Sequence, residues 1–245
     1  MEVLQDNDIH LKFLLGRPIH VEGMGDFYSP LLKDVIDITE DKYNTAISSI
    51  LFKKSMLNDT NEEIDKLTEF QVLNSIVYHD EYYRSMFFNG LKLHFNNYPR
   101  LHESGYIYFD EFSEESILTE DKFNYIKSLV RIANNIQEEK EEESYVAGND
   151  KARQFMEEQK KRKAMIAKLK KPKMNLHSII SAVGWKTQSF NFINQLNVYQ
   201  LYDGYYRNQM LDNYNHTMSG IYAGTIDGSK IKTEDINWAN IVNNK

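Results

Sequence analysis

Residues 176–242 read LHSIISAVGWKTQSFNFINQLNVYQLYDGYYRNQMLDNYNHTMSGIYAGTIDGSKIKTEDINWANIV. Asn197 and Gln200 have the spacing of a capping box, in which the cap side chain and the third helical residue satisfy each other's free amides. The tyrosine-rich run that follows has helical spacing. This stretch predicts a long helix from Asn197 through Tyr214 and a short final helix anchored by Trp238.

Helices are also expected on both sides of the middle of the chain. Thr39 and Thr119 precede apolar residues at helical spacing and are predicted N-caps. Ser29-Pro30 is expected to open a helix, with proline at the first helical position. Thr60 and the two glutamates after it resemble a capping box for a helix that continues past residue 70. Upstream of the long helix, a short apolar face is expected from Ile179, Ile180, Val183 and Trp185.

Two segments have strand patterns. Between Leu11 and Tyr28, short apolar stretches are broken by glycine and proline, which predicts a β-hairpin or a small meander. Leu91–Phe95 alternates with period two, as does Tyr106–Phe109 more loosely, so a second hairpin is expected across the residues between them. The predicted fold class is therefore α+β and mostly helical.

The expected organisation has three parts. Residues 1–136 form an α+β body of helices with two small β-hairpins, residues 137–174 a charged linker with a basic helix, and residues 175–245 a C-terminal helical subdomain. A chain of 245 residues is long enough for a buried core, and 41% of it is apolar. There is no cysteine, which excludes disulfides and thiolate metal sites. Because neither a signal peptide nor a long apolar run is visible, a soluble intracellular protein without a membrane segment is expected.

Charge is distributed unevenly along the chain. Residues 151–173 contain ten basic and two acidic residues, a net charge of +8; with −7 in total, the remaining residues carry −15. A basic patch could neutralise phosphates, and the residues that could do so at its centre are Lys160, Lys161, Arg162 and Lys163. The acidic remainder would repel nucleic acid, so nucleic-acid binding is not expected, and an acidic protein partner is favoured.

No pattern in the chain predicts catalysis. The seven histidines lack the spacing of a metalloprotease helix. The paired acids at 62–63, 114–115 and 120–121 lie in first turns of expected helices, where negative charge is stabilised by the helix dipole. Gly23-Met24-Gly25 lies within a hairpin signal and is better explained as a turn than as a nucleotide loop. We therefore expect no catalytic residue, no cofactor and no metal site.

The tyrosines of the C-terminal part are the other candidate binding residues. Tyr199, Tyr202 and Tyr206 are spaced by three and four residues along the expected long helix. Such residues either pack in the core or form an interface that is alternately wet and dry. Together with Trp238 they are the candidate partner-binding residues, and the two interpretations remain open.

Three stretches together resemble a known class of proteins. They are residues 16–51 (GRPIHVEGMGDFYSPLLKDVIDITEDKYNTAISSIL), 105–136 (GYIYFDEFSEESILTEDKFNYIKSLVRIANNI) and 194–207 (NQLNVYQLYDGYYR). In this order, with the charged segment between the second and third, they resemble phage tail assembly chaperones and neighbouring tail-module proteins of phages that infect Gram-positive bacteria.

The resemblance implies a non-enzymatic protein of the host cytoplasm. Such chaperones keep the apolar helices of the tape-measure protein soluble until tail-tube subunits assemble around it. It implies a self-associating body, a hinge in the charged segment, and a C-terminal part that binds the tape-measure or tail-tube protein. Two other classes remain open: a tail or head-completion component that stays in the virion, and a nucleic-acid-binding accessory protein that uses the basic helix.

Overall fold

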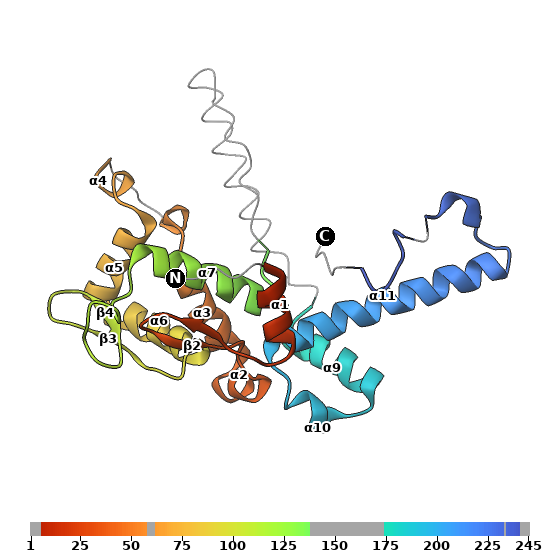
Figure 1. Ribbon diagram of the computed structural model, residues 1–245, viewed down its shortest axis with the longest axis horizontal. Coiled ribbons are helices and arrows are strands. Elements are labelled where there is room, and N and C mark those ends of the chain that lie inside the picture. Colours follow the sequence, from red (N-terminus) through yellow and green to blue (C-terminus); the bar gives the residue numbers. More distant parts are fainter. Residues whose placement is uncertain (1–5, 58–61, 138–173, 233, 241–245) are drawn as a thin grey trace, which may run out of the picture.

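The computed structural model describes residues 6–57, 62–137, 174–232 and 234–240. Within these ranges the fold is α+β and mostly helical, with two separate two-stranded antiparallel sheets, as predicted. Figure 1 shows a body built from the first half of the chain, and a long helix that extends away from it. The helices of the body are α1 (Asp6–Leu14), α2 (Leu32–Ile38), α3 (Glu40–Ile50), α4 (Glu62–Asp65), α5 (Glu69–His79), α6 (Glu81–His94) and α7 (Glu120–Ala133). The helices after residue 174 are α9 (Leu176–Thr187), α10 (Phe190–Ile193) and α11 (Val198–Tyr222), and the 3₁₀ turns are η1 (Lys54–Met56) and η2 (Gly228–Lys230).

The first hairpin is confirmed but is shorter than expected. Strand β1 (Ile19–Val21) pairs with β2 (Gly25–Phe27), with Ile19 opposite Phe27. Gly23 in the turn has φ +72° and lies so close to the backbone of Glu115 that a Cβ atom would be 1.8 Å from its carbonyl oxygen. The residues before Gly16 form α1, because Ile9 and Phe13 are spaced by four and both are buried.

The second hairpin forms from a different first strand than the one predicted. Strand β3 (Pro99–Leu101) pairs with β4 (Ile107–Phe109), so the second expected strand is confirmed and the first is wrong. Residues 91–94 belong to α6, which Asp80 caps by accepting from the Tyr83 amide. The apolar residues that α6 buries have helical spacing, and this outweighed the local alternation: Phe87, Phe88 and Leu91.

Helix starts were predicted with mixed success. Thr119 accepts from the Lys122 amide at the start of α7, as expected. Thr39 precedes α3, but its φ of +78° leaves its side chain without a capping hydrogen bond. The helix expected from Thr60 is interrupted: α4 ends at Asp65, and Thr68 forms a capping box with Gln71 at the start of α5. Thr60 itself lies outside the described residues.

The Ser29-Pro30 segment is extended and does not start a helix. Helix α2 begins two residues later, and Leu31 forms an antiparallel bridge with Asn197. The Leu32 amide donates to the Leu196 carbonyl, and the Val198 amide donates to the Pro30 carbonyl. This short backbone pairing joins the start of the chain to the start of α11.

One hydrophobic core joins the two halves of the described chain. Buried side chains of the body share this core with residues of α9, α10 and α11, namely Leu176, Ile179, Val183, Ile193, Val198 and Leu201. The Leu176 amide donates to the Glu40 carboxylate, which fixes the start of α9 beside α3. The division at residues 136 and 174 stays a prediction. No helix among the described residues is long and apolar enough to cross a membrane.

His94, the last residue of α6, is a buried imidazole in this core. Its ring stacks on Phe27 with centroids 4.6 Å apart, and its Nδ1 lies 2.9 Å from the Tyr28 carbonyl oxygen, to which it donates. Its Nε2 has no hydrogen-bond partner among the described residues. Burial lowers the pKa of His94 to about 4, against a weaker opposing effect of the bond to Tyr28. His94 is therefore neutral at physiological pH.

Acidification is expected to destabilise the protein through His94. Its pKa is lower in the folded state than the unfolded value of 6.5, so the unfolded chain binds the proton first. The stabilisation is full above pH 6.5 and is lost as the pH falls toward 4, by about 1.4 kcal/mol at pH 5.5. Chemical denaturation should show that the free energy of unfolding falls more steeply between pH 7.5 and 5 in the wild type than in His94→Phe, which has no imidazole at this position. Parallel pH profiles of the two proteins would contradict it.

Candidate interaction surface on the C-terminal arm

Asn197 fixes the base of α11 to the body. We call the described residues from 174 to 240 the C-terminal arm. The Asn197 side chain accepts from the Gln200 amide at 2.8 Å and donates from Nδ2 to the Phe13 carbonyl at 2.9 Å. The Gln200 side chain accepts from the Asn197 amide, which completes the predicted capping box. It also donates from Nε2 to the Leu14 carbonyl. One cap therefore starts the helix and ties it to α1.

Tyr199 lies in this attachment. Its hydroxyl is 2.9 Å from Nδ1 of His10, and its ring lies 5.9 Å from that of Phe13. Burial, and to a lesser extent the nearby Asp203 carboxylate, raises the pKa of Tyr199 to about 12, so the hydroxyl stays protonated. The structure places this candidate residue against α1, where it holds α11 to the body.

Tyr202 has a similar position one turn further along. It lines a small cavity of about 110 Å³ together with Tyr43 of α3 and Leu176 of α9. Burial raises the pKa of Tyr202, with smaller effects from Tyr206 and Glu40. Tyr199 and Tyr202 both pack against the core, so each has a contact within the chain.

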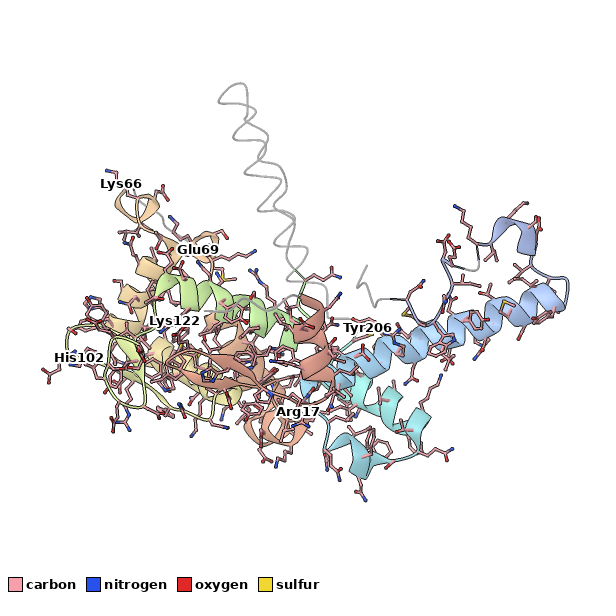
Figure 2. All side chains as sticks on the ribbon, in the orientation of Figure 1. Arg17, Lys66, Glu69, His102, Lys122 and Tyr206 are labelled. Atoms are coloured by element: carbon pink, nitrogen blue, oxygen red, sulfur yellow. The ribbon has the colours of Figure 1, made fainter. Side chains whose placement is uncertain are left out.

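Tyr206 and Trp238 lie where α11 has left the core. Figure 2 labels Tyr206 on the part of α11 near the body. Its ring meets Tyr205 edge-on with centroids 5.3 Å apart. The next residue, Arg207, donates to the main-chain carbonyls of Trp238 and Asn240 at 2.7 and 2.8 Å. The end of the described chain therefore returns to α11, and Trp238 is brought near the turn that carries Tyr206.

The final helix expected around Trp238 is wrong for the described residues. Residues 234–236 and 238–240 form turns, and Trp238 is 45% exposed. Lys160, Lys161, Arg162 and Lys163 lie outside the described residues, as does the rest of the expected basic helix. Asp227 and Gly228 form a turn, with the Asp227 side chain accepting from the Ser229 amide at the start of η2.

Three aromatic residues of α9 and α10 that the sequence did not single out as binding residues are exposed. Trp185 was expected on the apolar face of α9, but its side chain is 72% exposed, while Phe190 and Phe192 are 47% and 50% exposed. The Trp185 and Phe190 rings meet edge-on with centroids 5.5 Å apart. Phe190 lies directly over Gly184, where a Cβ atom would be 2.4 Å from its ring. The sequence does carry a signal for this exposure. Three of the four residues of α10 are apolar, which is more than so short a helix can bury, and Ile193 alone is buried.

The larger part of the arm, up to residue 226, carries little charge. Residues 175–226 contain only four charged side chains, Lys186, Asp203, Arg207 and Asp212, whereas charged residues make up 27% of the whole chain. Lys186 pairs with Asp212, and Arg207 lies 3.9 Å from Asp203. A surface with exposed aromatic rings and internally paired charges has the composition of a protein-binding surface.

The body contains an open groove of about 1140 Å³ between α2, α3 and α6. Its lining carries acids from α2 and α3 and cations from three elements: Asp34, Asp37, Asp41, Arg17, Lys42 and Lys92. Because the two signs balance, the groove favours no strongly charged ligand. No group of three or more histidine, aspartate or glutamate side chains in the described ranges could hold a metal ion.

The comparison with known families concerns the arm. Residues 168–243 match the family model described as the YomV second domain. YomV is a protein of the SPbeta region of a Bacillus phage, so the match is consistent with a phage protein. No curated protein and no solved structure matches the chain. The similarity to a phage-related domain thus covers the whole arm, including the exposed aromatic residues of α9 and α10.

Proposed function

We propose that this chain is a non-enzymatic tail assembly chaperone of a phage, acting in the host cytoplasm. It binds the tape-measure protein through the arm, helps recruit tail-tube subunits, and associates with further copies of itself. The observation that carries this proposal is the combination, within residues 175–226 of the arm, of exposed aromatic side chains and only four charged ones. The similarity of that arm to a phage-related domain supports the assignment to phage assembly.

The physical logic is that of a carrier for apolar helices. An apolar helix of a partner aggregates in water unless its apolar face is covered. Residues 175–226 of the arm can cover such a face without burying an unpaired ion, since Lys186 pairs with Asp212 and Arg207 lies beside Asp203. The body carries 23 acidic and 13 basic residues between positions 1 and 136, a net charge of −10, which keeps the complex soluble.

The proposal is tested by co-expression with the tape-measure protein encoded by the same phage. Most of the tape-measure protein should move from the pellet to the soluble fraction and should co-purify with the full-length chain. The matched control is the chain with Trp185, Phe190 and Phe192 changed to serine, whose folding is checked by circular dichroism. A tape-measure protein that stays insoluble with the wild-type chain would contradict the proposal.

The alternative of a retained virion component gives a different result. A chaperone should be missing from purified particles, whereas a tail or head-completion protein should be found there by mass spectrometry at a fixed stoichiometry. The nucleic-acid alternative depends on the basic helix, which lies outside the described residues. Retention on heparin that disappears when Lys160, Lys161, Arg162 and Lys163 are neutralised would favour it.

A further inference from the structure

The Trp185–Phe190 pair and its surroundings have the anatomy of a docking site. The two rings contact each other at the junction of α9 and α10, and Phe192 adds exposed apolar surface on the same short helix. Apart from Lys186, which pairs with Asp212, the exposed neighbours are uncharged amides and hydroxyls: Thr187, Gln188, Asn191, Asn194 and Gln195. An aromatic centre with a neutral polar rim is typical of a protein interface. We call this surface, residues 185–195, the aromatic corner.

We propose that the aromatic corner binds one amphipathic helix of a partner protein, whose contacting face is apolar and uncharged. The assignment rests on the proposed function for the identity of that protein, but its chemistry follows from the charge and the size of the corner. The aromatic corner is a binding site separate from the candidate tyrosines of α11, two of which, Tyr199 and Tyr202, already pack against the body.

Charge decides the kind of face that fits. The only charged side chain between Asn175 and Tyr202 is Lys186, and it is paired with Asp212. A partner side chain that brought a charge to the corner would lose its hydration and meet no free counter-ion. A face of leucine, alanine, glutamine and serine loses little by the same burial. The corner therefore selects against charged helices.

Size decides between a helix and a second copy of the chain. Aromatic side chains have roughly 150–250 Å² of surface each, so the three partly exposed rings offer on the order of 300–400 Å². A stable dimer needs about 800 Å² from each partner, while one helix face inserts only a few side chains spaced by three or four residues.

The position of Phe190 is set by Gly184, which gives the corner a fixed shape. Any side chain at position 184 would meet the Phe190 ring at 2.4 Å and displace it from its place beside Trp185. Gly184 is itself buried, so a substitution there moves the Phe190 ring without changing which side chains the corner exposes. Gly184→Ala therefore tests the arrangement of the rings separately from their presence.

The experiment uses the fluorescence of Trp185. The chain has two tryptophans, so Trp238→Phe leaves Trp185 as the only indole. The probe is an 18-residue helical peptide with a stripe of leucines flanked by glutamines, and two lysines on the opposite face for solubility. Its charged twin has balanced glutamate and lysine at the flanking positions. We expect a saturable blue shift of Trp185 emission with the neutral peptide, and at least roughly 10-fold weaker binding of the twin.

Variants localise the effect. Phe190→Ala and Gly184→Ala should each weaken peptide binding. The control is Tyr82→Ala on the body, because Tyr82 is 74% exposed and so resembles Trp185 in exposure. This variant should bind the peptide as the wild type does. The proposal is overturned by an absent shift, by equal binding of both peptides, or by a shift that survives Phe190→Ala. A shift that appears without peptide as protein concentration rises, with dimers in sedimentation, would assign the corner to a second copy.

The result can be separated from that of the proposed function. If wild type solubilises the tape-measure protein and Phe190→Ala does so equally well, the function stands and the aromatic corner is not its site. If the neutral peptide binds as expected and the tape-measure protein stays insoluble, the corner is a helix-binding site and the proposed function fails.

Discussion

Replacing Gly23 by alanine should lower the free energy of unfolding by roughly 2–5 kcal/mol. Its backbone is in the left-handed region at φ +72°, which costs about 1–2 kcal/mol for a residue with a side chain. The new Cβ would also lie 1.8 Å from the Glu115 carbonyl oxygen, and overpacking of this kind costs roughly 1–3 kcal/mol. Denaturant unfolding followed by far-UV circular dichroism measures the loss.

Gly16 provides a matched control for Gly23. It has almost the same φ, +65°, but no atom lies within 4 Å of the place its Cβ would take. Gly16→Ala should therefore cost only the conformational part, about 1–2 kcal/mol. Equal losses in the two variants would show that the close approach of the first hairpin to the 115–116 backbone contributes nothing.

Replacing Asn197 by alanine should destabilise the attachment of the arm by roughly 1.5–2.5 kcal/mol. The change removes an N-cap, worth about 1 kcal/mol. It also removes the buried hydrogen bond to the Phe13 carbonyl, worth roughly 0.5–1.5 kcal/mol, although that carbonyl still accepts from the Gly16 amide. Hydrogen exchange should accelerate in α1 and in the first turns of α11, with little change in α5 and α6. Unchanged exchange in α1 would contradict the proposed coupling.

Two further variants separate the roles of Asn197. Asn197→Asp keeps an acceptor for the cap but cannot donate to Phe13, so it should lose the tie to α1 and keep the helix start. Asn175→Ala removes the equivalent cap of α9, which is exposed, and should cost only about 1 kcal/mol. Similar losses for Asn175→Ala and Asn197→Ala would show that the buried bond to Phe13 adds no stability.

The sequence predicted best those features that depend on local chemistry. Thr119 and Asn197 cap helices as expected, since a cap needs only the residues of the next turn. The first hairpin was located by its glycines for the same reason. Leu91–Phe95 was misassigned because five residues that alternate can also end a helix, and only packing of the preceding turns decides between the two.

Features that depend on distant residues could not be predicted in this way. Ser29-Pro30 has the local pattern of a helix start, but its carbonyl pairs with Val198, which no nearby residue reveals. Tyr199 and Tyr202 were left open between core and surface, and their contacts with α1 and α3 come from the tertiary fold. Trp185 was expected on one face of α9 with Ile179 and Val183, which are buried as expected. Trp185 itself is exposed, because a residue two positions after Val183 lies on the opposite side of a helix.

The backbone pairing of residues 30–32 with residues 196–198 has a consequence for synthesis on the ribosome. A ribosome adds roughly 5–20 residues per second, so on the order of 10–30 s pass between translation of Leu31 and of Asn197. During this interval the part of α1 that packs against α11, and the Pro30 carbonyl, lack these partners, and only water or another protein can cover them. Native closure of the body therefore depends on residues made long after it, and truncated products that end before residue 197 should be captured by molecular chaperones.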